Sequence, residues 1–342
     1  MKPITTPTAK RQTRFGIMIS IISLIALFFI ASPRDIWSQL QTTHYSYLLL
    51  STLGIITFMT IRAIRWRFIL HNHWSWANIF HRQNIGFMLT YLLPLRIGDI
   101  ARVTLVSQSP EVPLATGFST VVVEQILDLL FIVLLLPLTV ASLPFLPYEV
   151  QLAGQVSTGI ALTAFIILIL AANSPQLSLR WLTIILNHLS FLPQKFILEQ
   201  TKNLLQGLDR LTRWRDALTL STLTIAIWLP VIFAYYWGLR AVNIEPTWYM
   251  SSFVVCMAAL SIAVPSSPGQ IGVFHASVTF ALVTVLGQPQ NPAATFAVIY
   301  HALSLIIMVT LGLIGWYKLQ INIPQLVTNA WQLIRRPTLA EE

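Results

Sequence analysis

Long apolar runs with almost no charged residues constrain this sequence more than any other feature. Residues 15–31 and 152–172 contain no Asp, Glu, Lys or Arg, and a bilayer-spanning helix needs about 20 apolar residues. Charged residues make up 10% of the chain, whereas about 25% is usual in soluble domains. The sequence therefore predicts an all-α, polytopic integral membrane protein and argues against a cytosolic enzyme and a nucleic-acid-binding protein.

The first apolar run follows Lys10, Arg11 and Arg14, as the apolar core of a signal peptide would. It ends in Ser32-Pro33 without an A-x-A cleavage pattern, so we expect an uncleaved span. Six spans are expected in all, at residues 15–31, 45–61, 114–137, 152–172, 217–239 and 292–317.

Two further hydrophobic segments, 85–106 and 248–286, are interrupted near their middle by proline and glycine. Backbone groups freed by such a break must be satisfied by protein or water. We therefore expect two re-entrant hairpins, which do not cross the membrane.

The distribution of positive charge supports this layout, because cytoplasmic loops are enriched in Lys and Arg. With a cytoplasmic N-terminus, 17 of the 21 Lys and Arg residues fall on the cytoplasmic side, including the segment 62–84. The prediction is a multi-pass protein of the plasma (cell inner) membrane with both termini cytoplasmic. The two hairpins then have opposite topology and form inverted repeats, as in many transporters.

The whole chain, 1–342, is expected to form one transmembrane domain. Within it, residues 173–216 combine apolar runs with six Lys and Arg residues. This pattern predicts a cytoplasmic connector of amphipathic helices on the membrane surface, and a solvated basic linker is the alternative.

Glu124 and Asp128 are the clearest ionisable residues at membrane depth, where each charge is costly. Their spacing of four places both carboxylates on one helical face. Two like charges repel, so a cation must lie between them or one must be protonated. Arg96 and Arg102 are the nearest candidate cations in the sequence, and a buried ion-pair network of purely structural role is the alternative.

The first hairpin carries Arg96, Asp99 and Arg102 at intervals of three, directly after Pro94-Leu95. A helix beginning at Ile97 would place free backbone N–H groups beside two guanidinium groups, which suits a phosphate. A short interfacial helix with arginines reaching to the membrane surface is the alternative.

The second hairpin contains Pro268-Gly269-Gln270-Ile271-Gly272, with His275 one turn later. Its glycines permit a tight turn and close approach of a ligand to a helix N-terminus. His301, in the last span, is another polar group at membrane depth. Both histidines can equally be hydrogen-bonded packing residues.

Enzyme signatures such as H-E-x-x-H and G-x-S-x-G do not occur in the sequence. The single cysteine, Cys256, permits no disulfide within the chain and argues against a thiolate metal site. We therefore expect no enzymatic activity, no metal and no cofactor.

Four motifs together resemble the transmembrane flippase domain of lysylphosphatidylglycerol synthases and its stand-alone relatives. They are residues 62–67 (RAIRWR), 94–102 (PLRIGDIAR), 124–128 (EQILD) and 265–272 (PSSPGQIG), and the resemblance covers about residues 15–317. It implies translocation of a charged lipid. The sequence departs from the family pattern at Asp99, Gln125, His275 and His301. Because only 25 residues follow Tyr317, we expect no soluble aminoacyltransferase domain of the kind that some relatives carry.

These features together predict a lipid flippase that works by alternating access. Its substrate is expected to be a phospholipid with a charged head group or a polyprenyl-phosphate lipid. The alternatives are a secondary transporter of a small solute, a membrane enzyme, and a membrane partner that supplies lipid-linked substrate to a glycosyltransferase or lipid-modifying enzyme. The expected head-group and translocation residues are Arg96, Asp99, Arg102, Glu124, Asp128, Pro268, Gly269, Gly272, His275 and His301.

Overall fold

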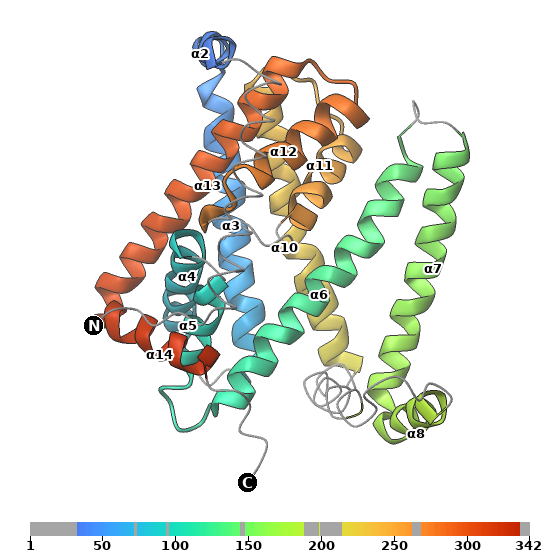
Figure 1. The fold of residues 1–342 in the computed structure, drawn as a ribbon, viewed down its shortest axis with the longest axis vertical. Coiled ribbons are helices and arrows are strands. Elements are labelled where there is room, and N and C mark those ends of the chain that lie inside the picture. The colour runs from blue at the N-terminus through green and yellow to red at the C-terminus, as the bar shows by residue number, and fades with distance from the viewer. Residues whose placement is uncertain are drawn as a thin grey trace.

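The computed structural model describes residues 33–71, 74–93, 96–143, 148–187, 198, 214–261 and 268–335, and all regular elements in these segments are helical. The expected first span, 15–31, lies outside the described residues. The helices, drawn in Figure 1, are α2 (Pro33–Gln41), α3 (Tyr45–Ile69), α4 (Trp76–Leu92), α5 (Ile97–Val106), α6 (Leu114–Ala141), α7 (Tyr148–Asn173), α8 (Pro175–Asn187), α10 (Trp214–Ala241), α11 (Trp248–Ser261), η3 (Pro268–Gln270), α12 (Val273–Phe280), η4 (Ala281–Val285), α13 (Gln290–Leu319) and α14 (Ile323–Arg335).

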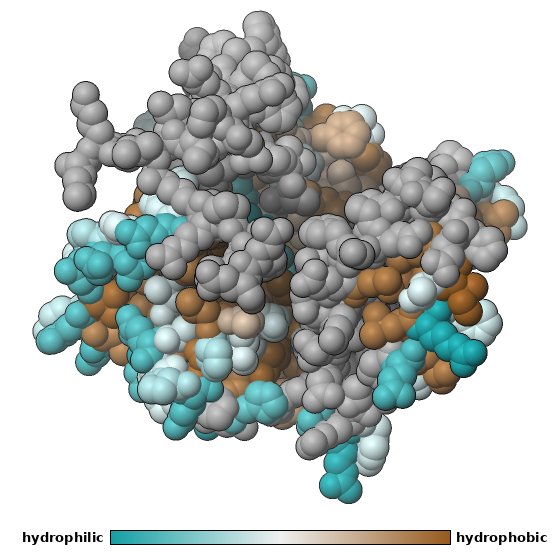
Figure 2. All heavy atoms as spheres, turned by 60° about the horizontal axis from the view of Figure 1, so that its bottom comes forward, coloured by the Kyte–Doolittle hydropathy of each residue, from teal (hydrophilic) through white to brown (hydrophobic). Residues whose placement is uncertain are grey.

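Four of the described helices, α3, α6, α10 and α13, are long and apolar enough to cross a membrane. Their 25 to 30 residues correspond to about 38–45 Å. Large apolar side chains remain exposed along these helices, including Leu53, Leu129, Leu229 and Ile306. On the face that Figure 2 shows, hydrophobic side chains lie between hydrophilic patches at its sides. This is the surface of a polytopic membrane protein whose exposed helix faces contact lipid.

The expected first hairpin is formed by α4 and α5, which pack against each other. A Cβ atom built on Gly86 would lie 2.8 Å from Cβ of Arg102, and one built on Gly98 would overlap the Gly86 carbonyl oxygen and Thr90. These contacts pair the end of α4 with the start of α5, so the two helices run antiparallel. Glycine is needed at both positions because the two backbones nearly touch.

The second hairpin runs from α11 through η3 and α12 to η4. The hydroxyl of Ser277 in α12 donates to the Met257 carbonyl oxygen of α11 at 2.9 Å, which joins the two arms. With 14 residues, α11 is about 21 Å long, too short to cross a hydrocarbon core of about 30 Å. In Figure 1 this hairpin lies in the upper half of the bundle and the α4–α5 hairpin in the lower half.

The main apolar core lies between the second hairpin and the long helices. It includes Ile227 and Leu239 of α10, Val254 of α11, Val278 of α12 and Phe296 of α13, all nearly inaccessible. A smaller cluster joins the first hairpin to α14 through Ile97, Leu326 and Ala330. Each hairpin is therefore packed into its own half of the bundle.

The structure corrects the expected segment boundaries around the first hairpin. Residues 62–84 were expected to form a cytoplasmic loop, but α3 continues to Ile69 and α4 already begins at Trp76. A charged residue often ends a span, but Arg62 and Arg65 are paired inside the bundle, so α3 continues past them. The described part of the expected connector 173–216 is mostly α8.

Candidate functional site

Glu124 of α6 lies at the centre of a group of buried charges. Its Oε2 atom lies 2.6 Å from Nη2 of Arg102, and neither side chain exposes more than 1% of its surface. Arg102 belongs to α5, so this ion pair joins the first hairpin to a long helix. The expectation that a hairpin arginine lies opposite the α6 carboxylates is confirmed for Arg102.

Asp128, one turn after Glu124, is held by two arginines of α3. Its carboxylate oxygens lie 3.0 Å from Nη2 of Arg62 and 2.8 Å from Nη2 of Arg65. Arg65 also lies 3.8 Å from Glu124, and its Nη1 donates to the Thr224 hydroxyl of α10 at 3.1 Å. Helices α3, α5, α6 and α10 therefore meet at this group of side chains.

The expected site lacks the two α3 arginines, because the charge pattern of the sequence places them in a loop. A signal for them exists in the sequence. Arg62 and Arg65 are three residues apart, so they share a helical face, and the apolar residues Ala63, Ile64 and Trp66 continue the preceding run. Two arginines on one face at the end of an apolar run match two carboxylates on one face of another span.

Aromatic rings surround the guanidinium groups. Phe87 of α4 lies between two of them, with its ring centroid 5.2 Å from Arg62 and 5.6 Å from Arg102. Trp66 lies 4.8 Å from the Arg102 guanidinium. Cations are attracted to aromatic faces, and more strongly where water is excluded. These rings hold the arginines at membrane depth without neutralising them.

We call this group the charge cluster. It consists of Arg62, Arg65, Asp99, Arg102, Glu124 and Asp128. It has three positive and three negative side chains, so its formal charge is zero.

The charge cluster has more buried hydrogen-bond donors without partners than acceptors without partners, although its formal charge is zero. Nε of Arg62, Nε of Arg65, and both Nε and Nη1 of Arg102 are buried without a hydrogen-bond partner among the described residues. On the acceptor side, one Glu124 oxygen is without such a partner, whereas both Asp128 oxygens lie within ion-pair distance of an α3 arginine. Buried donors without partners are costly, so the cluster is suited to a ligand that supplies acceptor oxygens.

Arg96 takes a different place from the one expected. Its Nε lies 3.0 Å from the Asp99 carboxylate, and 49% of its side chain is exposed. Among the ion pairs of the described residues, Arg96 is found with Asp99 and not with the α6 carboxylates. Asp99 also lies 3.9 Å from Arg102. Asp99 therefore links Arg96, at the exposed edge of the charge cluster, to buried Arg102.

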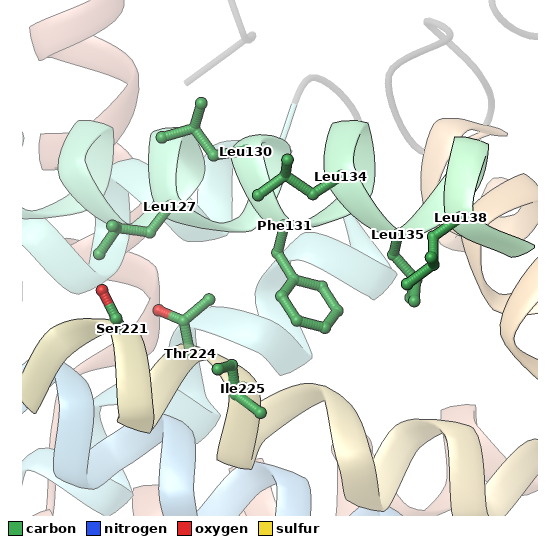
Figure 3. Close-up of a pocket in the computed structure, with 9 residues that line it drawn as sticks. All are labelled: Leu127, Leu130, Phe131, Leu134, Leu135, Leu138, Ser221, Thr224 and Ile225. Atoms are coloured by element: carbon green, nitrogen blue, oxygen red, sulfur yellow. The ribbon is translucent and has the colours of Figure 1, made fainter. Parts of the chain in front are cut away.

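An apolar groove of about 230 Å³ lies between α6 and α10, next to the charge cluster. Figure 3 shows Leu127, Phe131 and Leu135 of α6 pointing toward α10, where Thr224 and Ile225 face them. Its lining residues are Leu127, Leu130, Phe131, Leu134, Leu135, Leu138, Ser221, Thr224 and Ile225.

Thr224 connects the groove to the charge cluster, because the same hydroxyl lines the groove and accepts from Arg65. At the groove surface, Leu138 and Ile225 are each about half exposed. The groove therefore opens on the side of the bundle, where a membrane protein faces lipid.

The expected residues of the second hairpin form a separate group. Pro268 and Gly269 belong to η3, and Gly272 precedes α12 with a φ of 93° that only glycine adopts readily. His275 of α12 and His301 of α13 are buried, and Nε2 of His275 lies 3.4 Å from Nδ1 of His301. The two histidines, 26 residues apart in sequence, are thus direct neighbours.

One face of α4 lies beside both groups. Phe87 contacts the arginines, and Tyr91, one turn later, has its ring centroid 6.4 Å from that of His301. A Cβ built on Gly269 would lie 3.4 Å from the Tyr91 carbonyl oxygen. The tip of the second hairpin therefore touches the end of α4, and the two broken segments meet inside the bundle.

Within the described segments, no three His, Cys, Asp or Glu side chains gather in a way that would hold a metal ion. The site is thus built from arginines, carboxylates, two imidazoles and an apolar groove.

The fold and the buried charges define a polytopic helical membrane protein with two broken hairpins that meet near a charge cluster. The sequence model of the family described as "Lysylphosphatidylglycerol synthase TM region" matches residues 15–312. The chain belongs to this family, which confirms the resemblance seen in the sequence motifs.

A protein named "Glycosyltransferase AglD" from Haloferax volcanii is 22% identical to this chain over 358 residues. The match covers 92% of this chain and 55% of the AglD chain, so this chain spans about half the length of that curated relative. No solved structure matches the chain.

Proposed function

We propose that the protein is a lipid flippase that moves a phosphate-bearing lipid between the leaflets of the plasma membrane. The observation that carries the proposal is the continuity between the charge cluster and the apolar groove through Thr224. A lipid has the same arrangement, because a polar head group is joined directly to a hydrocarbon chain.

The charge cluster supports an anionic head group with acceptor oxygens. Its unpartnered guanidinium nitrogens outnumber its unpartnered carboxylate oxygens, and a phosphate offers acceptor oxygens in a geometry that arginine matches well. Phosphatidyl lipids and polyprenyl phosphates share this chemistry. The three carboxylates balance the charge of the three arginines, which limits the cost of holding them at membrane depth.

The groove supports a single hydrocarbon chain. At about 230 Å³ it is smaller than pockets for drug-sized ligands, which begin at about 300 Å³. A chain that moves from the bilayer into this groove exchanges one apolar environment for another, so its burial adds little affinity. Selection then depends on the head group, and the groove guides the chain while the head group crosses.

The two broken hairpins supply the moving parts in this proposal. They approach from opposite ends of the bundle and touch at Gly269 and Tyr91. Alternating access would separate and rejoin them around the charge cluster, with no chemical bond made or broken. Both chain termini would lie on the cytoplasmic side, as the excess of positive charge there indicates.

Reconstitution of the purified protein into phosphatidylcholine vesicles tests this proposal. Fluorescent phosphatidylglycerol, phosphatidylethanolamine and a polyprenyl phosphate would be placed in both leaflets, and a membrane-impermeant quencher added outside. We expect quenching of the transported lipid to pass the outer-leaflet fraction in vesicles that contain protein. Equal quenching with and without protein for every lipid would refute the proposal.

A small-solute transporter is the first alternative, and it requires a closed aqueous path. The exposure of Leu138 and Ile225 along the groove favours lipid instead, because it gives lateral access from the bilayer. Uptake of inorganic phosphate into the same vesicles without lipid movement would support the solute alternative.

Supply of a lipid-linked substrate to a glycosyltransferase is the second alternative, and the similarity to a protein named "Glycosyltransferase AglD" favours it. In that case the transported lipid would carry a sugar phosphate and the transferase would be a separate partner. Co-purification with such an enzyme, together with movement of a polyprenyl-phosphate sugar in vesicles, would support this form of the proposal.

A further inference from the structure

The histidine pair, His275 of the second hairpin and His301 of α13, is hydrogen-bonded in a defined order. The backbone N–H of Gly272 donates to Nδ1 of His275 at 3.3 Å, and Nε2 of His275 lies 3.4 Å from Nδ1 of His301. The two imidazoles therefore join Gly272, at the start of α12, to α13.

These contacts determine where the protons lie. A backbone N–H only donates, so Nδ1 of His275 must accept and carries no proton. The neutral ring of His275 then holds its proton on Nε2 and donates it to His301. Nδ1 of His301 must therefore also be without a proton. The lone pair on each of the two unprotonated Nδ1 atoms thus accepts a hydrogen bond.

One additional proton has to break one of these two bonds. If it binds Nδ1 of His275, the Gly272 N–H faces another donor, while the bond to His301 survives. If it binds Nδ1 of His301, the bond between the rings is lost. Protonation at Nδ1 of His275 leaves the charged ring hydrogen-bonded to the neutral ring of His301. A second proton on the pair would place two cations about 3.4 Å apart.

The surroundings of the pair contain aromatic and weakly acidic groups. Among the ion pairs of the described residues, none includes either histidine, and the arginines of α3 pair with Asp128 of α6. Of the titratable side chains on the helices packed around the pair, Tyr91 of α4 lies beside His301, and Tyr300 of α13 stacks on Phe274, which contacts both histidines.

We infer that His275 and His301 form a binding site for a single proton, which opens the Gly269–Gly272 turn when it is occupied. Protonation at His275 removes the hydrogen bond that fixes Gly272 at the start of α12. The other end of the turn, Gly269, contacts the end of α4 at Tyr91. Proton binding therefore acts on the contact between the two hairpins.

This site would make the proton the coupling ion of lipid movement, a step that rests on the proposed function. A state with tight hairpin contact and a state with an open turn differ in their affinity for one proton. A proton gradient then shifts the population between them, because a ligand shifts an equilibrium by its differential affinity for the two states.

The first experiment measures proton binding without any transport. The full chain, with ¹⁵N-labelled histidine and glycine, is placed in phosphatidylcholine nanodiscs and followed by NMR from about pH 8 to about pH 4, a range wider than that of a free imidazole because burial disfavours the charged ring. We expect both rings of the pair to change together and to gain one proton, with loss of the Gly272 amide hydrogen bond. Two rings that titrate independently, or that stay neutral throughout, would overturn the inference.

The second experiment measures lipid movement in vesicles with and without a pH gradient. We expect the wild-type rate to change by up to about tenfold per pH unit, as for control by one proton. His275→Asn keeps an acceptor for the Gly272 N–H but cannot bind the proton, so its response should fall below about twofold. His44→Gln, a histidine before α3 and outside the pair, should respond as the wild type does.

The two experiments separate failure of the inference from failure of the proposed function. Lipid movement that ignores the gradient in the wild type, with a pair that stays neutral, overturns the inference and leaves the flippase proposal intact. Uptake of one proton by the pair, with no lipid movement at any pH, supports the proton site and overturns the proposed function.

Discussion

Nη2 of Arg102 lies 2.6 Å from Oε2 of Glu124, and both side chains are almost completely buried. The pair joins α5 of the first hairpin to α6, so it has a structural effect as well as a place in the charge cluster. Loss of one partner from a buried pair leaves an unpaired charge and costs about 3–5 kcal/mol. Replacement of both partners by apolar residues often costs much less.

A double-mutant cycle on this pair separates packing from transport. We expect Glu124→Leu and Arg102→Met each to lower the thermal unfolding temperature strongly, and the double variant to recover part of that stability. Lipid movement should not recover, because the double variant lacks one of the proposed head-group ligands. Recovery of both properties in the double variant would show that the pair serves packing alone.

An exposed ion pair provides the control for this cycle. Arg240 and Glu245 lie 3.8 Å apart, and Glu245 is 85% exposed. Exposed pairs contribute little because water and salt screen them. Glu245→Gln should therefore leave both the unfolding temperature and lipid movement unchanged.

The groove between α6 and α10 can be filled without touching the charge cluster. Leu134 lines the groove, whereas Leu129, on the same helix, is outside the groove lining and 53% exposed. We expect Leu134→Trp to slow lipid movement in the vesicle assay, because the larger ring occupies the space proposed for the hydrocarbon chain. Leu129→Trp adds the same ring on the same helix and should have little effect.

Equal rates in these two tryptophan variants would contradict the assignment of the groove. Head-group binding gives a second measurement, since the charge cluster is intact in both. Leu134→Trp should therefore still bind a short-chain phosphatidyl lipid with affinity close to that of the wild type, even though movement is slow.

Close contact between the arms of the first hairpin is tested at Gly98. A Cβ atom there would overlap the Gly86 carbonyl oxygen and Thr90, so Gly98→Ala forces α4 and α5 apart. Overpacking of this kind costs about 1–3 kcal/mol, and we expect a lower unfolding temperature together with slower lipid movement. In α7, a Cβ on Gly159 would meet nothing within 4 Å, so Gly159→Ala should be tolerated. Similar losses in both variants would contradict the close packing of this hairpin.

Scarcity of ionisable residues at membrane depth made part of the site predictable. Glu124 and Asp128 stand in an otherwise apolar run, and their expected cation includes Arg102, which lies against Glu124 in the structure. The broken segments were also predictable, because Pro and Gly interrupt hydrophobic runs at both places. All-helical architecture followed from the same apolar runs.

Contacts between distant segments were not predictable from one sequence. Arg62 and Arg65 were assigned to a loop because the helix end was placed at the first charge, although pairing with Asp128 allows the helix to continue. His275 and His301 meet only because the second hairpin folds back onto α13. The groove is formed by leucines that resemble every other leucine in these helices, so only their placement distinguishes them.

Arg96 combines an unusual backbone with an exposed charge, and two substitutions separate these properties. Its φ of 52° and ψ of 34° lie in the left-handed region, which costs a residue with a Cβ about 1 kcal/mol or more and glycine almost nothing. Arg96→Gly should therefore be more stable to heat than Arg96→Ala. Both variants lose the same charge, so both should slow movement of an anionic lipid to a similar extent.

Salt distinguishes capture of head groups at the exposed edge of the charge cluster from a role in its interior. The side chain of Arg96 is 49% exposed, and at about 1 M salt charges are screened within about 3 Å. We expect the difference between Arg96→Gly and wild type to shrink as salt rises, because the wild type loses its electrostatic advantage. The effect of changing buried Arg102 should persist, since water and ions do not reach it. A salt-independent defect in Arg96→Gly would instead place Arg96 in direct contact with the transported head group.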